Sequence, residues 1–269
     1  MSVQARILVL PVWSDLIVRA QPPPSTLLSV SCCLRLFSVH TPAGSVKVTV
    51  EERYGHAMAS HVWDAGICLS FFLQTHYIPH LNPSTSLRAM EIASGSGLLG
   101  LVLATLLPAR STLVLTEKPT SLELLQHNLE QLQPISSTHI SICGLEWGNQ
   151  VHLLDLPHRD KSTDLLVLAD VLYNWAAHPQ LWSTVAAVAS PSTTIYLAHK
   201  HRAATSTAAL RHLETYGTCP SCPAVSCALN SPSSCGWKNG LWKLHRCASY
   251  GATDIFQLVI QPPHTEMDV

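Results

Sequence analysis

The sequence predicts an α/β fold built on a mostly parallel sheet. Three observations predict it: expected strands and helices alternate from residue 87 to residue 215, the segment 164–169 is apolar along almost its whole length, and a glycine-containing loop at 93–97 joins a strand to a helix. Alternation of this kind calls for right-handed crossovers and therefore for parallel neighbouring strands. A continuous apolar run suits a strand that helices cover on both faces.

An N-terminal extension, residues 1–50, is expected to precede the main domain, residues 51–269. Strand-like segments at 34–40 and 45–52 flank a Pro-Ala-Gly turn and predict a β-hairpin. Three consecutive prolines lie upstream of the hairpin and forbid regular structure there, so residues 1–33 are expected to be irregular.

Hydrophobic periodicity predicts the elements of the main domain. Helices are expected where apolar residues recur every three or four positions, at 62–76, 98–107, 121–132, 175–189 and 203–215. Strands are expected where short apolar runs end at polar or turn residues, at 87–93, 112–116, 139–143, 164–169, 193–198 and 255–260. The segment 216–247 contains a stretch rich in Ser, Pro and Cys and is expected to be a divergent insertion or loop.

Composition narrows the class of protein. Hydrophobic residues make up 47% of the 269 residues, which is enough for a sizeable core. The net charge of −1 gives no sign of the basic face that nucleic-acid binding needs. The longest apolar run, 98–107, is too short for the roughly 18 residues of a membrane span, and the N-terminus makes a poor signal peptide. We therefore expect a cytoplasmic, or also nuclear, monomer that binds neither nucleic acid nor membrane.

Six of the nine cysteines fall into two kinds of sequence context. Cys68 and Cys143 lie in apolar runs and are expected to be reduced thiols of the core, which suits a reducing compartment. A second group lies in the Ser/Pro-rich stretch, namely Cys219, Cys222, Cys227 and Cys235. Its first two members have the spacing of a zinc knuckle, but the other two do not repeat that spacing, so no metal site is predicted.

The strand ends carry the chemistry, because ligands of open α/β sheets bind at the carboxyl ends of the strands. Gly95 and Gly97 follow the first strand of the main domain and open the next helix, whose N-terminal amides point at the same place. Glu117 ends the following strand, 20 residues after Gly97, where an acid can accept hydrogen bonds from both hydroxyls of a ribose. Together these features predict a nucleotide-like cofactor site.

The identity of the cofactor is open on spacing alone. Gly100 completes a Gly95-x-Gly97-x-x-Gly100 pattern, which a dinucleotide-dependent oxidoreductase would also show. The acidic Glu91 within the preceding strand disfavours a pyrophosphate. It suits a cofactor that carries an amino group and a sulfonium cation, such as S-adenosylmethionine.

Four short motifs lie at or beside the strand ends: Val62-Trp63-Asp64-Ala65, the loop from Glu91 to Gly97, Leu145-Glu146-Trp147-Gly148, and Asp170-Val171-Leu172-Tyr173. As a set they resemble the methyltransferase-like lysine methyltransferases, sometimes called family 16. Members of this family act on elongation factors, heat-shock chaperones and valosin-containing protein. The resemblance spans about residues 50–203, and the Asp-x-x-Tyr element is its most specific part.

The resemblance implies a Rossmann-like, seven-stranded methyltransferase sheet, mostly parallel with an antiparallel last strand, and helices on both faces. It implies a protein-lysine N-methyltransferase that uses S-adenosylmethionine and acts on a protein substrate such as a chaperone or an elongation factor. The implied cofactor-binding residues are Trp63, Glu91, Gly95, Gly97, Glu117, Trp147 and Asp170. Of these, the two glycines would border the methionine part, Glu117 would bind the ribose, Trp147 would pack on the adenine and Trp63 would cover the pocket. Asp170 and Tyr173 would be the catalytic residues, at the mouth where the target side chain meets the methyl group.

Two departures from the family pattern leave alternatives open. Ala93 stands where the family has the first glycine of its loop, and an alanine with positive φ would cost roughly 1 kcal/mol. Asn174-Trp175 follows Tyr173 where acidic residues are frequent in the family. The alternatives are a methyltransferase for arginine, histidine or a small molecule, and a non-catalytic, cofactor-binding relative that serves as an interaction module.

Overall fold

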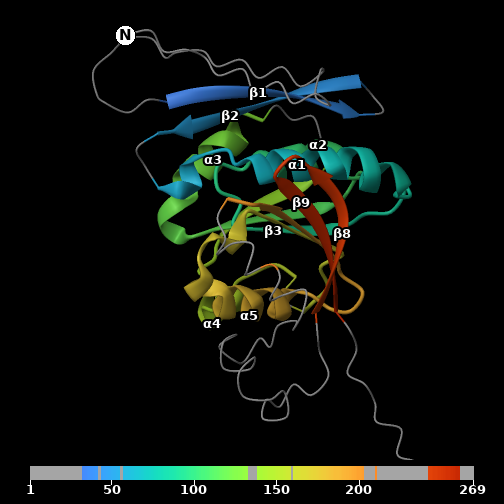
Figure 1. Ribbon diagram of the computed structural model, residues 1–269. Coiled ribbons are helices and arrows are strands. Elements are labelled where there is room, and N and C mark those ends of the chain that lie inside the picture. Colours follow the sequence, from blue (N-terminus) through green and yellow to red (C-terminus); the bar gives the residue numbers. More distant parts are fainter. Residues whose placement is uncertain are drawn as a thin grey trace, which may run out of the picture.

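The computed structural model describes residues 32–41, 44–54, 57–132, 138–158, 160–202, 210 and 242–260 (Figure 1). Its centre is a seven-stranded sheet with the order β5-β4-β3-β6-β7-β9-β8. The strands are β3 (Arg88–Ile92), β4 (Thr112–Glu117), β5 (His139–Gly144), β6 (Leu165–Ala169), β7 (Thr194–Lys200), β8 (Trp242–Tyr250) and β9 (Thr253–Ile260). The chain passes from β3 outward to β5 and then returns to the other side of β3, so the topological switch point lies between β3 and β6.

Strand directions confirm the predicted mostly parallel sheet. The five strands from β3 to β7 pair in parallel, whereas β9 runs antiparallel to β7, as the last strand was expected to do. The sequence prediction missed β8, because its first residues fall at the end of the segment 216–247 that was expected to be an insertion or loop. As an edge strand with mostly exposed or half-exposed side chains from Leu244 to Tyr250, β8 lacks the apolar run that marked the other strands.

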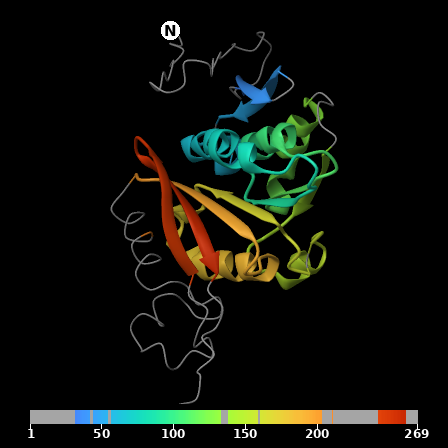
Figure 2. The same ribbon diagram turned by 90° about the vertical axis from the view of Figure 1, so that its right-hand side faces the viewer.

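Helices cover both faces of the sheet (Figure 2). One face is covered by α1 (Asp64–Phe72), α2 (Leu98–Leu106) and α3 (Leu122–Glu130), and the other by α4 (Gln150–Leu154) and α5 (His178–Val188). Each helical layer encloses its own buried core. The helix expected at 62–76 is shorter as an α-helix, because the chain passes at Leu73–Tyr77 into a π-helical turn. The sequence prediction missed α4, a helix of only five residues.

The pleat of β3 determines which layer each of its side chains meets. Met90 and Ile92 belong to the core on the α4 and α5 side, whereas Ala89 belongs to the core beneath α1, α2 and α3. Because side chains alternate along a strand, Glu91 shares the α2 side with Ala89. Its Oε2 atom lies 2.7 Å from where a Cβ on Gly100 would stand, directly beneath α2.

The predicted hairpin is confirmed as β1 (Cys32–Thr41) and β2 (Gly44–Arg53), which pair antiparallel. It forms a layer outside the helices and buries Phe37 and Val50, among other side chains, against α2 (Figure 1). Asn128 of α3 fixes it further, since its side chain accepts from the Glu51 amide at 2.8 Å and donates to the Glu51 carbonyl at 3.0 Å. The expected boundary at residue 51 falls inside β2, so the hairpin is continuous with the main domain.

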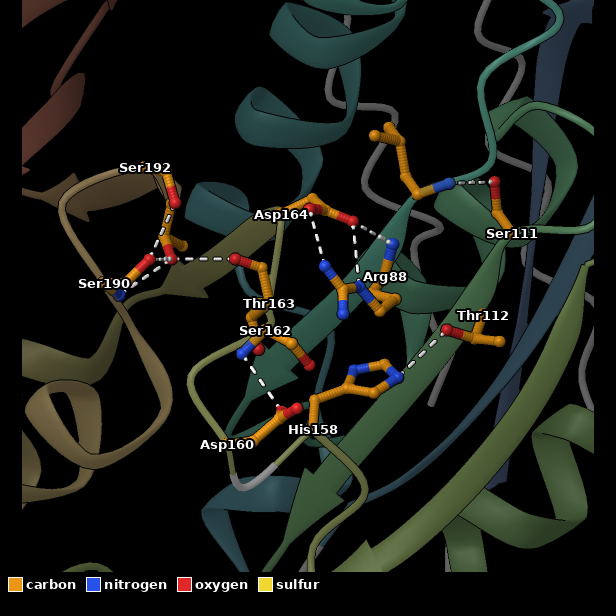
Figure 3. A network of polar contacts seen from close by, with 12 residues as sticks. Arg88, Ser111, Thr112, His158, Asp160, Ser162, Thr163, Asp164, Ser190 and Ser192 are labelled. Carbon is orange, nitrogen blue, oxygen red and sulfur yellow. Dashed lines mark hydrogen bonds and ion pairs between the residues drawn. The ribbon is translucent and has the colours of Figure 1, made fainter.

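The amino end of the sheet is held by polar contacts between neighbouring strands (Figure 3). Arg88, the first residue of β3, and Asp164, which precedes β6, are joined by backbone and side-chain hydrogen bonds. The guanidinium contacts both carboxylate oxygens at 3.3 Å. His158 lies beside them and contacts the Thr112 hydroxyl at 3.1 Å, as Figure 3 shows. Asp164 stands before the first residue of β6, and Asp170 follows its last residue at the opposite end of the sheet.

Some expectations fall on residues outside the described ranges. They include the irregular segment 1–33 apart from its last two residues, the helix at 203–215 apart from Leu210, and the cysteines from Cys219 to Cys235. Within the described ranges, no helix is long and apolar enough to cross a membrane.

Candidate active site

A cavity of about 250 Å³ lies at the carboxyl ends of β3, β4 and β6, at the topological switch point. This is the position where open α/β sheets bind their ligands. Its wall includes most of the predicted site residues, namely Trp63, Gly95, Glu117, Trp147, Asp170 and Tyr173. The remainder of the wall is Met58, Ala59, Ala93, Lys118, Leu145, Ala169, Val171 and Arg202.

The loop after β3 reaches the cavity through a series of left-handed residues. Ala93, Gly95 and Gly97 have φ angles of 61°, 56° and 92°. The Ser94 amide donates to the Thr116 carbonyl at 2.8 Å, which ties the loop to the end of β4. Ala93 therefore has the positive φ that was considered from the sequence. Because alanine has a Cβ, the backbone is strained at this position in the cavity wall.

Glu117 joins the end of β4 to the glycine loop. The Gly95 amide donates to its Oε2 and the Lys118 amide donates to its Oε1, both at 2.9 Å. The Glu117 side chain is almost wholly buried but lies in the cavity wall. A carboxylate oxygen can accept more than one hydrogen bond, so both oxygens can also accept from a bound ligand.

Two residues of the predicted cofactor set lie outside the cavity wall. Glu91 is 2% exposed and points from β3 toward α2, because the pleat of the strand directs it there. Gly97 is the left-handed residue on which α2 begins, and a Cβ at this position would stand 2.6 Å from Leu125 Cδ1. The structure thus places Gly97 in the packing between α2 and α3 rather than against the cavity.

Both tryptophans of the predicted site are placed in the cavity wall rather than in the core. Trp63 precedes α1, is 38% exposed, and its indole donates to the Met58 carbonyl at 3.1 Å. Trp147 packs half-buried against the core on the α5 side and is followed by Gly148, whose amide donates to the Thr184 hydroxyl at 2.8 Å. The cavity therefore has an aromatic side chain contributed from each of two distant segments.

Asp170 and Tyr173 follow β6 at the mouth of the cavity. Asp170 is buried, has a φ of 58°, and its side chain makes no cap bond to the helical turn that follows, so it is not a helix cap. Tyr173 is 51% exposed, and burial of the rest of its ring, with the nearby acids Glu117 and Asp170, raises the pKa of its hydroxyl. The carboxylate of Asp170 is instead held by Arg202, which follows β7 and which the sequence analysis did not single out.

A sequence signal for Arg202 did exist. β6 and β7 were both predicted as strands, and the parallel pairing of Ala169 with Ala198 brings the residues after them together. A basic residue after one strand and an acid after its neighbour could therefore have been expected to pair.

Replacing Ala93 with glycine is expected to stabilise the fold. Glycine adopts a φ of 61° without strain, which outweighs the greater freedom that it gives the unfolded chain. We expect Ala93→Gly to raise the free energy of unfolding by about 1 kcal/mol in a urea titration. Ala186→Gly in α5 is the matched control, because it should lower stability by about 0.5–1 kcal/mol. A loss of stability in both variants would contradict the strain at Ala93.

Glu91 should make stability depend on pH. Burial, with a smaller contribution from nearby Glu117, raises its pKa to about 8, although the Ser94 hydroxyl and the Gly100 amide oppose the shift. Between about pH 4.5 and pH 8 the folded chain keeps this proton and the unfolded chain loses it. The stability that Glu91 contributes is thus complete below about pH 4.5 and is lost as the pH rises to about 8.

We therefore expect Glu91→Gln to match the wild type near pH 5 and to be more stable by a few kcal/mol near pH 8.5. Urea titrations at both pH values measure the difference. Glu130→Gln, on the exposed side of α3, should show no such divergence. The same difference for Glu91→Gln at both pH values would rule out the raised pKa.

The sheet is parallel from β3 to β7 and has an antiparallel β9, and a cavity lined by a glycine loop and an acid lies at its switch point. These features define a Rossmann-like methyltransferase domain. The family model described as "Lysine methyltransferase" matches residues 43–216. The chain belongs to this family, which confirms the resemblance that the four motifs indicated.

Curated relatives match over most of the same region. A UPF0665 family protein of Schizosaccharomyces pombe is 27% identical over 198 residues, which cover 72% of this chain and 57% of that protein. EEF1A lysine methyltransferase 3 of Mus musculus is 26% identical over 159 residues, covering 58% of this chain and 63% of that protein. Protein N-lysine methyltransferase METTL21A of Mus musculus is 31% identical over 146 residues, covering 54% of this chain and 62% of that protein. The chain thus spans about three fifths of the length of these relatives.

Proposed function

We propose that this chain is an S-adenosylmethionine-dependent methyltransferase that methylates a lysine side chain of a protein substrate. The observation that carries the proposal is the convergence of Gly95, Glu117, Asp170 and Tyr173 on one cavity at the switch point of the sheet. Membership of the lysine methyltransferase family supports the choice of reaction and acceptor.

The chemistry of the cavity wall fits S-adenosylmethionine. Glu117 offers carboxylate oxygens to the hydroxyls of a ribose, and the apolar Leu145 and the indole of Trp147 offer surfaces for the adenine. Beneath the loop, the Oε2 atom of Glu91 is buried and has no hydrogen-bond partner among the described residues. That atom lies beneath α2 and outside the cavity wall, so the fit to the cofactor rests on Glu117 and on the apolar and aromatic part of the wall.

When bound, S-adenosylmethionine supplies an activated methyl group, which a neutral amine accepts as the sulfonium sulfur leaves as a thioether. The protein's contribution is alignment and exclusion of water. Trp63 and Tyr173 both line the cavity, where their rings can exclude water from the bound cofactor and amine. Asp170, beside Tyr173, accepts a hydrogen bond from the amine and so orients the nitrogen lone pair into the cavity.

A protein substrate is supported by the surface around the mouth. Four large exposed hydrophobic side chains make up what we call the exposed rim: Met58, Trp63 and Tyr173 of the cavity wall, and Tyr54 near Trp63. His61 links the rings of Tyr54 and Trp63, at centroid distances of 5.1 Å and 5.9 Å. A clustered, exposed and largely aromatic surface is typical of protein interaction sites. The names of the murine relatives, which specify protein-lysine or EEF1A methylation, support the same class of substrate.

The test combines cofactor binding with methyl transfer. Calorimetry measures binding of S-adenosylmethionine, and the tritiated cofactor is incubated with the protein and a cell lysate, followed by mass spectrometry of the labelled residue. We expect binding, one or few labelled proteins, and methyl-lysine. Label on arginine, histidine or a small molecule would show that the acceptor is that group and not lysine. Binding of the cofactor without any methyl transfer would favour a non-catalytic interaction module. Absence of both binding and label would overturn the proposal.

A further inference from the structure

Arg202 is held between two residues of the candidate site. Its Nη1 atom donates to Asp170 Oδ1 at 2.6 Å and its Nη2 atom donates to Asp170 Oδ2, so the contact is bidentate. The guanidinium carbon lies 5.0 Å from the centroid of the Trp63 ring. Asp170 is thereby neutralised by a permanent cation, because an arginine side chain does not lose its proton in proteins.

This arrangement bears on the protonation of the target amine, and the inference rests on the proposed function. A lysine has an ordinary pKa of ~10.4 and must lose a proton before its nitrogen can accept a methyl group. An unpaired Asp170 would attract the charged ammonium and hold it in the unreactive form. An Asp170 paired with Arg202 still has lone pairs that accept a hydrogen bond from a neutral amine, but the pair as a whole does not favour the cation.

We propose that Arg202 is a positioning residue that fixes and neutralises the Asp170 carboxylate, so that the site accepts the target amine in its uncharged form. The bidentate contact engages both carboxylate oxygens and so fixes the orientation of the Asp170 side chain, and packing on Trp63 holds the guanidinium. The positive charge of Arg202 at the mouth also disfavours a second cation beside it.

The charged and titratable groups on and directly after β7 are themselves partnered or uncharged. Lys200 of β7 forms an ion pair with Asp64 at the start of α1, and His201 contacts Asp254 of β9 at 3.0 Å. Burial lowers the pKa of His199 to about 4, so this ring is neutral under assay conditions. From the β4 side, the ionisable groups that face the mouth are Glu117 and Lys118, with Tyr173 from the turn after β6.

Asp164 and Asp170 flank β6, and each binds one arginine, so the chain offers a matched control. Arg88 pairs with Asp164 at the end of the sheet away from the cavity (Figure 3). Arg88→Gln removes the same charge and a similar contact without touching the candidate site. Arg202→Gln removes the cation at the mouth, Arg202→Met does so while keeping an apolar side chain over Trp63, and Arg202→Lys keeps the charge.

The experiment measures initial rates of methyl transfer from labelled S-adenosylmethionine between pH 7 and pH 9.5. Poly-L-lysine and, in parallel, the total protein of a cell lysate serve as acceptors. If the bound amine gains about one pKa unit when Arg202 is neutralised, the maximal rate of Arg202→Gln and Arg202→Met should fall about tenfold at pH 7.5. The deficit should narrow as the pH rises, and the apparent KM for poly-L-lysine at pH 7.5 should fall.

Arg202→Lys should keep the pH profile of the wild type, and so should Arg88→Gln. Rates that fall equally at every pH in the neutral variants, with unchanged KM, would overturn the inference and leave Arg202 a structural role. Rates that rise would overturn it too, because the ion pair would then be an obstruction. If neither neutral variant folds, as judged by thermal unfolding, the inference is also overturned, because Arg202 is then needed for the stability of the fold. An inactive wild type on both acceptors would instead refute the proposed function.

Discussion

Replacement of Glu117 by alanine should nearly abolish cofactor binding while leaving a folded protein. Glu117 lies in the cavity wall, and each of its carboxylate oxygens can accept a hydrogen bond from a ribose hydroxyl besides the one from a backbone amide. Hydrogen bonds to a charged group contribute about 1.5–3 kcal/mol each, so loss of two should weaken binding by roughly 100-fold or more. Calorimetry with S-adenosylhomocysteine measures the change, and circular dichroism verifies the fold.

The conservative variant sharpens this prediction. Glu117→Gln keeps one oxygen but turns an amide N–H₂ toward the backbone N–H of Gly95 or Lys118, so it should recover only part of the affinity. Glu130→Ala, an exposed acid on α3, is the control and should bind as the wild type does. Wild-type affinity in Glu117→Ala would mean that this acid does not contact the cofactor.

Replacement of Gly97 by alanine should destabilise the fold through two separate effects. Its φ of 92° is strained for any residue with a Cβ, and that Cβ would stand 2.6 Å from Leu125 Cδ1. Leu125 is fully buried and has little room to move. Backbone strain of about 1 kcal/mol and overpacking of about 1–3 kcal/mol together predict a loss of about 2–4 kcal/mol. For a domain of this size the melting temperature should fall by roughly 5–12 °C in a thermal scan.

Gly251 in the turn between β8 and β9 separates the two effects. It also has a positive φ, of 62°, but no atom lies within 4 Å of where its Cβ would stand. Gly251→Ala should therefore cost only the backbone strain, about 1 kcal/mol. Equal losses in the two variants would show that contact with Leu125 contributes nothing.

Local sequence patterns predicted the central strands well, because the short apolar runs that mark these strands lie within a few consecutive residues. Leu165–Ala169 is apolar on both faces, and such a run is legible without any knowledge of its neighbours. β8 carried no such signal, because an edge strand needs to bury less of its surface and its side chains are mostly polar or exposed. The short α4 was missed for a related reason, since five residues show too little of the helical period.

The candidate site was predictable where it depends on strand ends. Parallel strands bring the residues that follow them to one edge, and so Gly95, Glu117 and Asp170 meet as expected. Two residues of the predicted cofactor set lie outside the cavity wall, and their role in binding stays a prediction. Glu91 lies within β3, where the alternation of side chains along the strand directs it toward α2. Gly97 lies beyond the part of the loop that lines the cavity, at the start of α2.

The sequence alone determined the alternation of the central strands and helices, the glycine loop with its acid at the end of β4, and the motifs that indicate the family. It also identified Ala93 as the doubtful position of that loop, and the φ of 61° bears this out. Only the tertiary structure decided how the charges are paired. Arg202 and Asp170 are 32 residues apart and carry no motif in common, yet their contact follows from the parallel pairing of β6 and β7. Local sequence patterns record propensity and periodicity, whereas such a contact depends on which strands become neighbours and on where each side chain points once they do.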